Sequence, residues 1–111
     1  MATPQRTIDY LLEQATSAGM VSAKPMFGEY GVYVDGKMIG SICDGQLFVK
    51  STPTGRIHAE PVSDALPYPG AKPQMLIEAD RWDNAKWLGE LLRVTAAELP
   101  APKPRKPKPS T

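Results

Sequence analysis

Two Asp-Gly dipeptides, Asp35-Gly36 and Asp44-Gly45, constrain this 111-residue chain more than any other feature. Each dipeptide lies between runs that are rich in strand-forming residues. Asp-Gly in such a position is the strongest short-range signal for a two-residue hairpin turn, because a type I′ turn needs positive φ at both central residues. The two turns therefore predict a three-stranded antiparallel meander over about 26–34, 37–43 and 46–50.

The turns also predict how the strands pair, and hence which side chains share a face. With two-residue loops, Val32 faces Ile39 and Gly31 faces Gly40. Because side chains alternate across a strand, the two glycines then lie side by side and leave a dent into which a helix can pack closely. We therefore expect the helices to cover this glycine face, which also carries Tyr33, Met38, Ile42, Leu47 and Val49.

The opposite face of the meander is the candidate binding surface. This face is too apolar for a fully solvent-exposed surface and too polar for a buried core, which favours a protein interface. A second copy of the chain is one candidate partner. Scattered apolar residues on a solvated face are also common, and this plainer interpretation stays open. A one-residue slip in register would exchange the two faces. The candidate interface residues are Tyr30, Val32, Val34, Ile39 and Phe48.

Helices are expected at both ends of the folded region. Apolar residues at helical spacing predict a first helix over about 4–18, with Thr3 or Thr7 as its N-cap and Gly19 at its end. A last helix is predicted over about 83–98, with Asp80 or Asp83 as its cap. The buried stripe expected on this last helix is Leu88, Leu91, Leu92, Thr95 and Leu99, with Trp87 at its edge.

Smaller elements are expected between the meander and the last helix. Thr52 before Pro53 predicts a short capped helix that Pro61 ends. Four prolines make 61–73 an expected loop, and 74–79 is the expected fourth strand. A run of strands with helices at the ends predicts an α+β fold of two layers, in which an antiparallel sheet carries the terminal helices on one face.

Length and composition fit one globular domain over residues 1–99. The chain is 41% apolar and 23% charged, which is ordinary for a soluble globular protein. No apolar run is long enough to span a bilayer. The single cysteine, Cys43, rules out an internal disulfide and fits a reducing compartment. We therefore expect a cytoplasmic protein that does not contact the membrane.

Residues 100–111 differ sharply in composition from the rest of the chain. They alternate proline with Lys, Arg and Ala and hold no large apolar residue, which predicts a disordered tail biased toward polyproline II. Such a tail can solvate the protein, act as a linker or bind an aromatic groove. It can also contact phosphates weakly and without sequence preference, so a nucleic-acid-associated module is the alternative function. The candidate nucleic-acid contacts are Lys103, Arg105, Lys106 and Lys108.

Residues suited to catalysis or metal binding are sparse. A zinc site normally needs several His or Cys ligands, and Cys43 and His58 are the only ones. The two lie in different segments, and the aspartates are explained by turns and caps, so neither a nucleophile nor an acid/base pair is predicted. Tyr33 is expected on the face opposite Tyr30 and Phe48, which argues against a stacking platform for bases. We expect a non-enzymatic protein without a metal or cofactor.

The segment Met26–Tyr33 (MFGEYGVY), with Asp35–Met38 and Leu47–Lys50 after it, resembles the N-terminal domain of the TfoX/Sxy competence regulators. Pro69–Pro73 and Trp87–Leu99 fit the same family, so the resemblance covers about residues 5–99. It implies a two-layer, secretion-chaperone-like domain in which helices back an antiparallel sheet. It also implies a cytoplasmic bacterial protein connected with regulation, since the named members act in switching on DNA-uptake genes.

Longer members of that family carry a second, C-terminal domain where this sequence has its Pro/Lys-rich tail. The resemblance supplies no catalytic or ligand-binding residue. The function expected from the sequence is therefore a non-enzymatic regulatory or adaptor domain that acts through protein contacts, with self-association among them.

Overall fold

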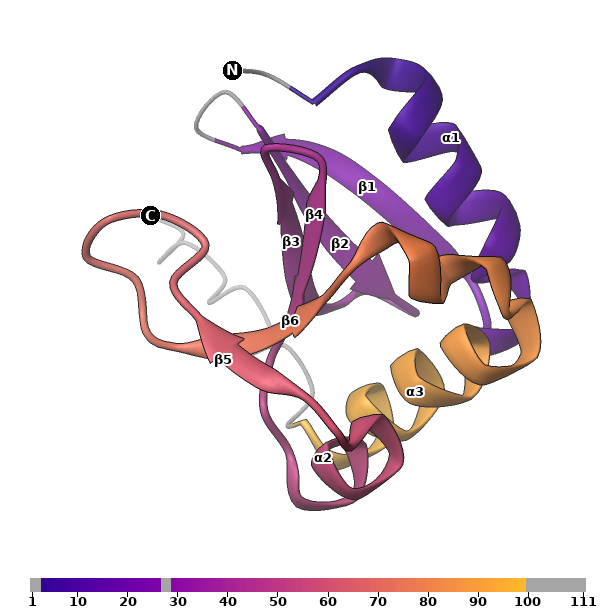
Figure 1. Cartoon of the computed structure of the whole chain (residues 1–111). Helices are drawn as coiled ribbons and strands as arrows, with labels where there is room; N and C mark the ends of the chain where they lie inside the picture. The colour runs from indigo at the N-terminus through magenta and orange to yellow at the C-terminus, as the bar shows by residue number, and fades with distance from the viewer. Residues whose placement is uncertain (1–2, 27–28, 100–111) are drawn as a thin grey trace, which may run out of the picture.

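A six-stranded antiparallel sheet with helices on one side forms the protein (Figure 1). The computed structural model describes residues 3–26 and 29–99. The strands lie in the order β1-β2-β3-β4-β6-β5, and each neighbouring pair is antiparallel. The elements are α1 (Gln5–Gln14), a 3-10 turn η1 (Thr16–Ala18), β1 (Val21–Met26), β2 (Glu29–Val34), β3 (Lys37–Cys43), β4 (Gln46–Val49), α2 (Pro53–Ala59), β5 (Ser63–Ala65), β6 (Gln74–Ile77), a second 3-10 segment η2 (Ala79–Asp83) and α3 (Ala85–Glu98). This arrangement confirms the α+β fold with helices on one face.

Both predicted hairpin turns are confirmed. Asp35 and Gly36 have φ of 50° and 84°, and Asp44 and Gly45 have φ of 54° and 75°. Positive φ at both central residues is the type I′ signature, which matches the twist of the flanking strands. The second turn also sets the predicted pairing of β3 with β4, in which Cys43 opposes Gln46 and Ser41 opposes Phe48.

The pairing of β2 with β3 differs from the prediction because β3 bulges. Tyr33 opposes Met38, but the register then shifts and Val32 opposes Gly40. The predicted Val32–Ile39 and Gly31–Gly40 pairs are therefore wrong. At Gly40 the backbone comes so close to β4 that an added Cβ would lie 2.0 Å from the carbonyl oxygen of Phe48. Only glycine fits this approach without a shift of one of the strands.

The bulge changes which side chains enter the core. Ile39 and Ile42 are three residues apart, so in a regular strand they would point to opposite faces. Both are fully buried in the same core cluster, because the extra residue turns the strand between them. Side chains that a regular register would place on two faces therefore pack together beneath the helices.

The helices consequently cover the face that the sequence was expected to leave uncovered. Val32, Val34 and Ile39 are at most 1% exposed and belong to the core, so their assignment to an exposed interface is wrong. Tyr30 is half-buried against the same core and donates a hydrogen bond to Gln5 Oε1 at 3.4 Å. Phe48, the fifth candidate, pairs with Ser41 on the other face and is nearly buried there.

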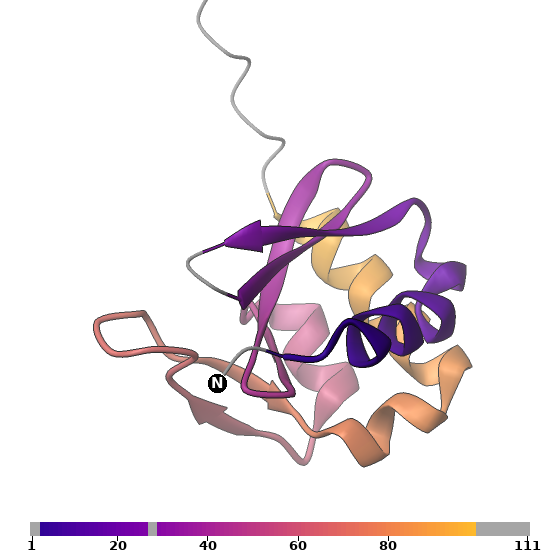
Figure 2. The same cartoon turned by 90° about the horizontal axis from the view of Figure 1, so that it is seen from above.

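We call the sheet face turned away from the helices the open face; it carries Gly31, Tyr33, Met38, Ser41 and Phe48. A Cβ added at Gly31 would lie 3.2 Å from the Tyr33 ring and 3.3 Å from the Met38 methyl carbon, which places all three side by side. Figure 2 shows α1 and α3 on the opposite side of the sheet. The predicted dent needed Gly31 beside Gly40 and does not form; Gly31 lies on the open face, where Tyr33 and Met38 occupy the space next to it.

Two strands, β1 and β5, were not predicted from the sequence. β1 (Val21–Met26) lies almost entirely between the first predicted helix and the first predicted strand, and it contains Pro25 opposite Tyr30. Proline has no N–H to give to a sheet, but β1 is an edge strand and tolerates this loss. β5 lies within the expected loop and holds only three residues, paired with β6. β6 and the short helix α2 confirm their predictions, and the Thr52 side chain accepts from the Gly55 N–H as expected of a cap.

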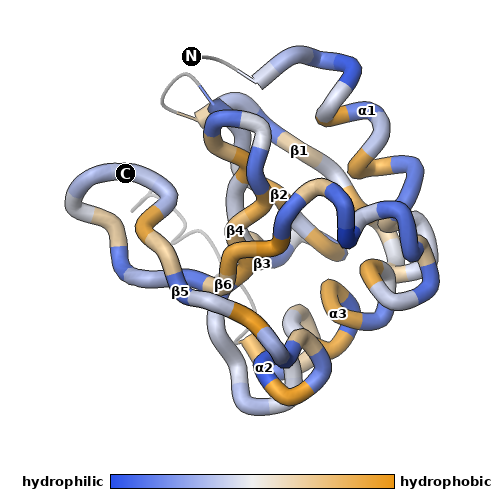
Figure 3. Tube along the Cα trace, viewed as in Figure 1, coloured by the Kyte–Doolittle hydropathy of each residue, from blue (hydrophilic) through white to orange (hydrophobic). Residues whose placement is uncertain are grey.

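The two long helices are confirmed, but α1 ends at Gln14 and the 3-10 turn η1 takes up the rest of the predicted range, and the caps at both helix starts differ from the prediction. Thr3 does not cap α1, because its hydroxyl accepts a hydrogen bond from the Gly45 N–H instead, and Pro4 occupies the N-cap position. Asn84, and not Asp80 or Asp83, caps α3 by accepting from the Trp87 N–H at 3.1 Å. Figure 3 shows apolar residues along α3 and β6, and polar residues alternating with apolar ones along α1. The predicted stripe of α3 is confirmed at Leu88, Leu91, Leu92 and Thr95, whereas Leu99 is only partly buried.

Candidate functional site

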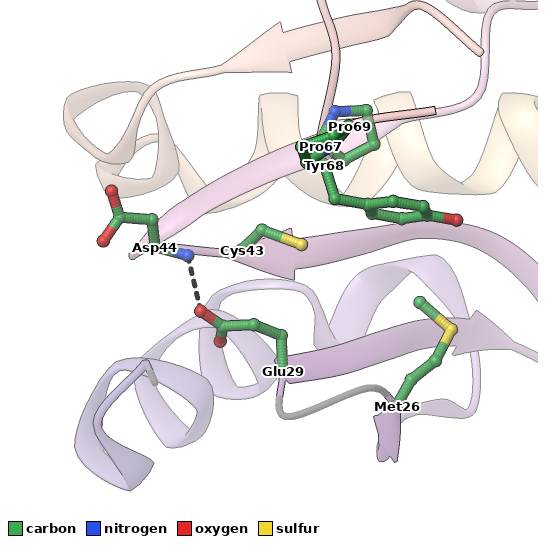
Figure 4. A pocket seen from close by; sticks show the side chains of 7 residues that line it. All are labelled: Met26, Glu29, Cys43, Asp44, Pro67, Tyr68 and Pro69. Carbon is green, nitrogen blue, oxygen red and sulfur yellow. Dashed lines mark hydrogen bonds between the residues drawn. The ribbon is translucent and has the colours of Figure 1, made fainter. Parts of the chain in front are cut away.

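The open face contains a hollow of about 590 Å³ near one end of the sheet. Its walls come from the end of β1, the start of β2, the end of β3 and the loop between β5 and β6 (Figure 4). The lining is largely apolar and consists of Met26, Glu29, Cys43, Asp44, Pro67, Tyr68 and Pro69.

The strand register determines why Cys43 lies in this hollow. Ser41 opposes Gly31 and Phe48 on the open face, and Cys43 follows two residues later on the same side. Met26 is the last residue of β1, beside the start of β2. In Figure 4 the Cys43 side chain points toward the space that the Tyr68 ring and the Met26 side chain border.

The loop between β5 and β6 brings an aromatic ring over the open face. Pro67 is buried and anchors the loop, whereas Tyr68 remains 44% exposed. A turn holds this arrangement: the Ala71 N–H donates to the Tyr68 carbonyl at 3.1 Å, and Gly70 has a φ of 87°. A ring that is half-exposed and flanked by two prolines offers a rigid apolar contact at low entropic cost.

Glu29 supplies a fixed negative charge at the floor of the hollow. Its carboxylate accepts hydrogen bonds from the Asp44 N–H at 2.8 Å and from the Thr3 N–H at 2.9 Å. Desolvation by burial acts to raise the pKa of Glu29, but the hydrogen bonds from Asp44 and Thr3 outweigh it and lower the pKa below its usual value. The carboxylate is therefore ionised at neutral pH, and it ties the second hairpin turn to β2 and to the start of α1.

The chemistry of Cys43 is that of a buried thiol. Burial raises the pKa of Cys43, and the nearby Ser41 hydroxyl, 4.0 Å from the sulfur, only partly opposes this effect. A thiol with a raised pKa carries little thiolate at neutral pH, and the thiolate is the nucleophile. The lining of the hollow thus offers apolar contact with a negative charge beside it.

His58 is engaged elsewhere, between α2 and α3. Its Nε2 lies 3.1 Å from the Trp87 carbonyl oxygen, and its ring stacks on the Trp87 indole with a centroid separation of 5.7 Å. The indole N–H donates to the His58 carbonyl at 3.2 Å, and the Arg81 guanidinium lies 4.1 Å from the indole ring centre. These contacts join the two helices. Within residues 3–26 and 29–99, no three His, Cys, Asp or Glu side chains are arranged to hold a metal ion.

None of the predicted interface residues lines the hollow. Met26, Cys43 and Tyr68, which do, were not identified from the sequence as site residues. The one available signal was the Pro67-Tyr68-Pro69 run, an aromatic residue between two prolines in a segment expected to be a loop. The candidate nucleic-acid contacts Lys103, Arg105, Lys106 and Lys108 lie outside the described residues, and their role stays a prediction.

Comparisons with known proteins find one matching family model and one uncharacterised relative. Residues 13–99 match the model of the TfoX N-terminal domain. The chain is also 43% identical to an uncharacterised 12.7 kDa protein in the trpE 5′ region of Spirochaeta aurantia, over 100% of this chain and 96% of that protein. In the part of the chain that the structure describes, no helix combines the length and apolar character needed to cross a membrane.

Proposed function

Because this chain belongs to the TfoX N-terminal domain family, we propose that it is a non-enzymatic, cytoplasmic regulatory or adaptor domain that acts through protein contacts. Its contact surface is the open face around the hollow, and its partner is another regulatory protein or a second copy of the chain. The domain occurs in competence regulators, which is consistent with a role in regulation.

The observation that supports this function best is the exposed apolar rim of the hollow. Tyr68 is 44% exposed and lines a largely apolar depression. A depression lined by an exposed aromatic side chain is typical of a protein interface, where Tyr and Trp are enriched among the residues that contribute most to the binding free energy. A single exposed apolar residue would need no explanation, but this one lies at a hollow.

The ionisable groups of the hollow support binding over catalysis. The Glu29 carboxylate accepts hydrogen bonds from two backbone N–H groups, so it positions the hairpin turn and is not free to transfer a proton. The Cys43 thiol has a raised pKa. A general base or nucleophile needs the opposite conditions, namely free access to the substrate and a pKa matched to the reaction.

Replacing Tyr68 with alanine should weaken partner binding by about 30-fold, the effect of losing an aromatic anchor worth roughly 2 kcal/mol. The measurement is the amount of partner, or of second copy, retained by an affinity-tagged full chain in extracts of its native cells. Tyr10→Ala is the matched control, because Tyr10 is 39% exposed and lies on α1, on the opposite side of the sheet. Equal retention by both variants would contradict the proposed function.

A further inference from the structure

We propose that residues 100–111 of the same chain cover the hollow, and that a protein partner must displace them in order to bind. This inference rests on the proposed function, since it assigns a regulatory device to the same surface. Three features favour this occupant: the chemistry of the lining, the opposite charges of tail and body, and the length of chain between the end of α3 and the hollow.

The lining suits a proline-rich ligand. The tail reads PAPKPRKPKPST, with five prolines and four cations. Segments of this composition are already extended as polyproline II, so they dock against aromatic surfaces with little loss of conformational entropy. The hollow offers the Tyr68 ring between two prolines, with the Met26 thioether opposite (Figure 4).

The charges of the two parts are opposite. Residues 1–99 hold nine Lys and Arg against twelve Asp and Glu, a net charge of −3, whereas residues 100–111 carry four cations and no acid. Two of the acids line the hollow: Glu29, whose carboxylate is held in place, and Asp44 beside it. A basic segment next to these carboxylates gains an attraction that added salt screens.

The tail is long enough to reach the hollow from the end of α3. Lys37 donates hydrogen bonds to the carbonyl oxygens of Ala96 at 2.9 Å and Leu99 at 3.2 Å, so the end of α3 is held beside the start of β3. Cys43 ends the same strand, ~20 Å away at about 3.3 Å per residue, and crossing from the helix layer to the open face adds ~10 Å. Twelve residues in polyproline II span ~37 Å. Lys108, nine residues after Leu99, lies up to ~28 Å along this path, so its side chain can reach the two carboxylates.

This docking would make the tail an intramolecular competitor. A segment tethered to the domain is present at a high effective concentration, so a partner must bind more tightly than the tail or arrive with a segment that substitutes for it. Binding through the open face would then release residues 100–111, and their cations would become available to another ligand. The device thus couples contact at the hollow with exposure of a basic tail.

The test is paramagnetic relaxation in the ¹⁵N-labelled full chain carrying Cys43→Ser and a spin label at Ser110→Cys. The amides of Met26, Asp44 and Tyr68 should be broadened more than the amides of α1. Tyr68→Ala, or 1 M salt, should reduce this enhancement at least about threefold, whereas Tyr10→Ala should leave it unchanged. A second measurement needs no cysteine change: reversing the four tail cations to glutamate should shift the same three amide signals.

Several results would overturn the inference. Weak, uniform broadening that ignores Tyr68→Ala would show that the tail does not occupy the hollow. Equal broadening in a mixture of ¹⁵N-labelled chain without the spin label and unlabelled chain with it would assign the hollow to the tail of a second copy. The first outcome leaves the partner retained through Tyr68 untouched, and the second would make a second copy that partner, so failure of tail docking and failure of the proposed function are distinguishable.

Discussion

Replacing Ile39 with aspartate should unfold the domain, whereas the same change at the neighbouring Met38 should leave it folded. Ile39 is fully buried in the core beneath the helices, and a carboxylate there has no partner. Burial of an unpaired charge costs more than about 4 kcal/mol, most of the stability of a typical domain. Met38 is half-buried on the open face, where an aspartate can reach water.

Circular dichroism during denaturant unfolding measures this difference. The pair of variants is informative because the regular hairpin register predicts the reverse outcome, with Met38 under the helices and Ile39 exposed. A folded Ile39→Asp variant together with an unfolded Met38→Asp variant would show that the bulge in β3 does not form and that the two faces are exchanged.

Gly40→Ala should destabilise the domain by about 3 kcal/mol, near the upper end of the cost of overpacking. The new methyl group would meet the Phe48 carbonyl oxygen at 2.0 Å, so β3 or β4 must move and lose hydrogen bonds of the sheet. The free energy of unfolding in urea gives the magnitude. Gly31→Ala is the matched control in the adjacent strand.

The control should lose less than about 1 kcal/mol. At Gly31 the atoms nearest to an added methyl group are side-chain atoms of Tyr33 and Met38, at 3.2 and 3.3 Å, and these can rotate away. Equal losses at the two glycines would show that the close approach of β3 to β4 at Gly40 does not set the cost.

The hairpins could be predicted because their signal is local. Asp35-Gly36 and Asp44-Gly45 specify positive φ within two residues, and no distant contact is needed to read it. The caps of α2 and the stripe of α3 are local in the same sense. Asn84 was missed because η2 ends just before it and takes up the aspartates that were expected to cap the helix.

The face of the sheet could not be predicted because it depends on one extra residue. Without the bulge at Gly40, each residue of β2 from Val32 back toward the start of the strand would face a different residue of β3. The side chains that point into the core would then change as well. The glycine marks the position, but a glycine in a strand is equally consistent with a dent for a helix, which is how it was interpreted. Only the structure, in which a Cβ added at Gly40 would lie too close to the Phe48 carbonyl oxygen, shows that the glycine is needed for the close approach of β3 to β4.

The hollow could not be predicted from the sequence for a related reason. Its walls come from three parts of the chain that are distant in the sequence: Met26 and Glu29, Cys43 and Asp44, and Pro67–Pro69. β5 and β6 must pair before the loop that joins them can lie over the open face, and β5 has only three residues with no apolar alternation to reveal it.

Site-specific photo-crosslinking is the most direct test of whether the open face is the contact surface. A benzophenone amino acid replaces Tyr68 in one full-length chain and Tyr10 in another, and both are irradiated in native cells. If the open face is the contact surface, a defined adduct with the partner or with a second copy forms at position 68 and none forms at position 10. An adduct at position 10 with none at position 68 would instead place the contact surface on the helices.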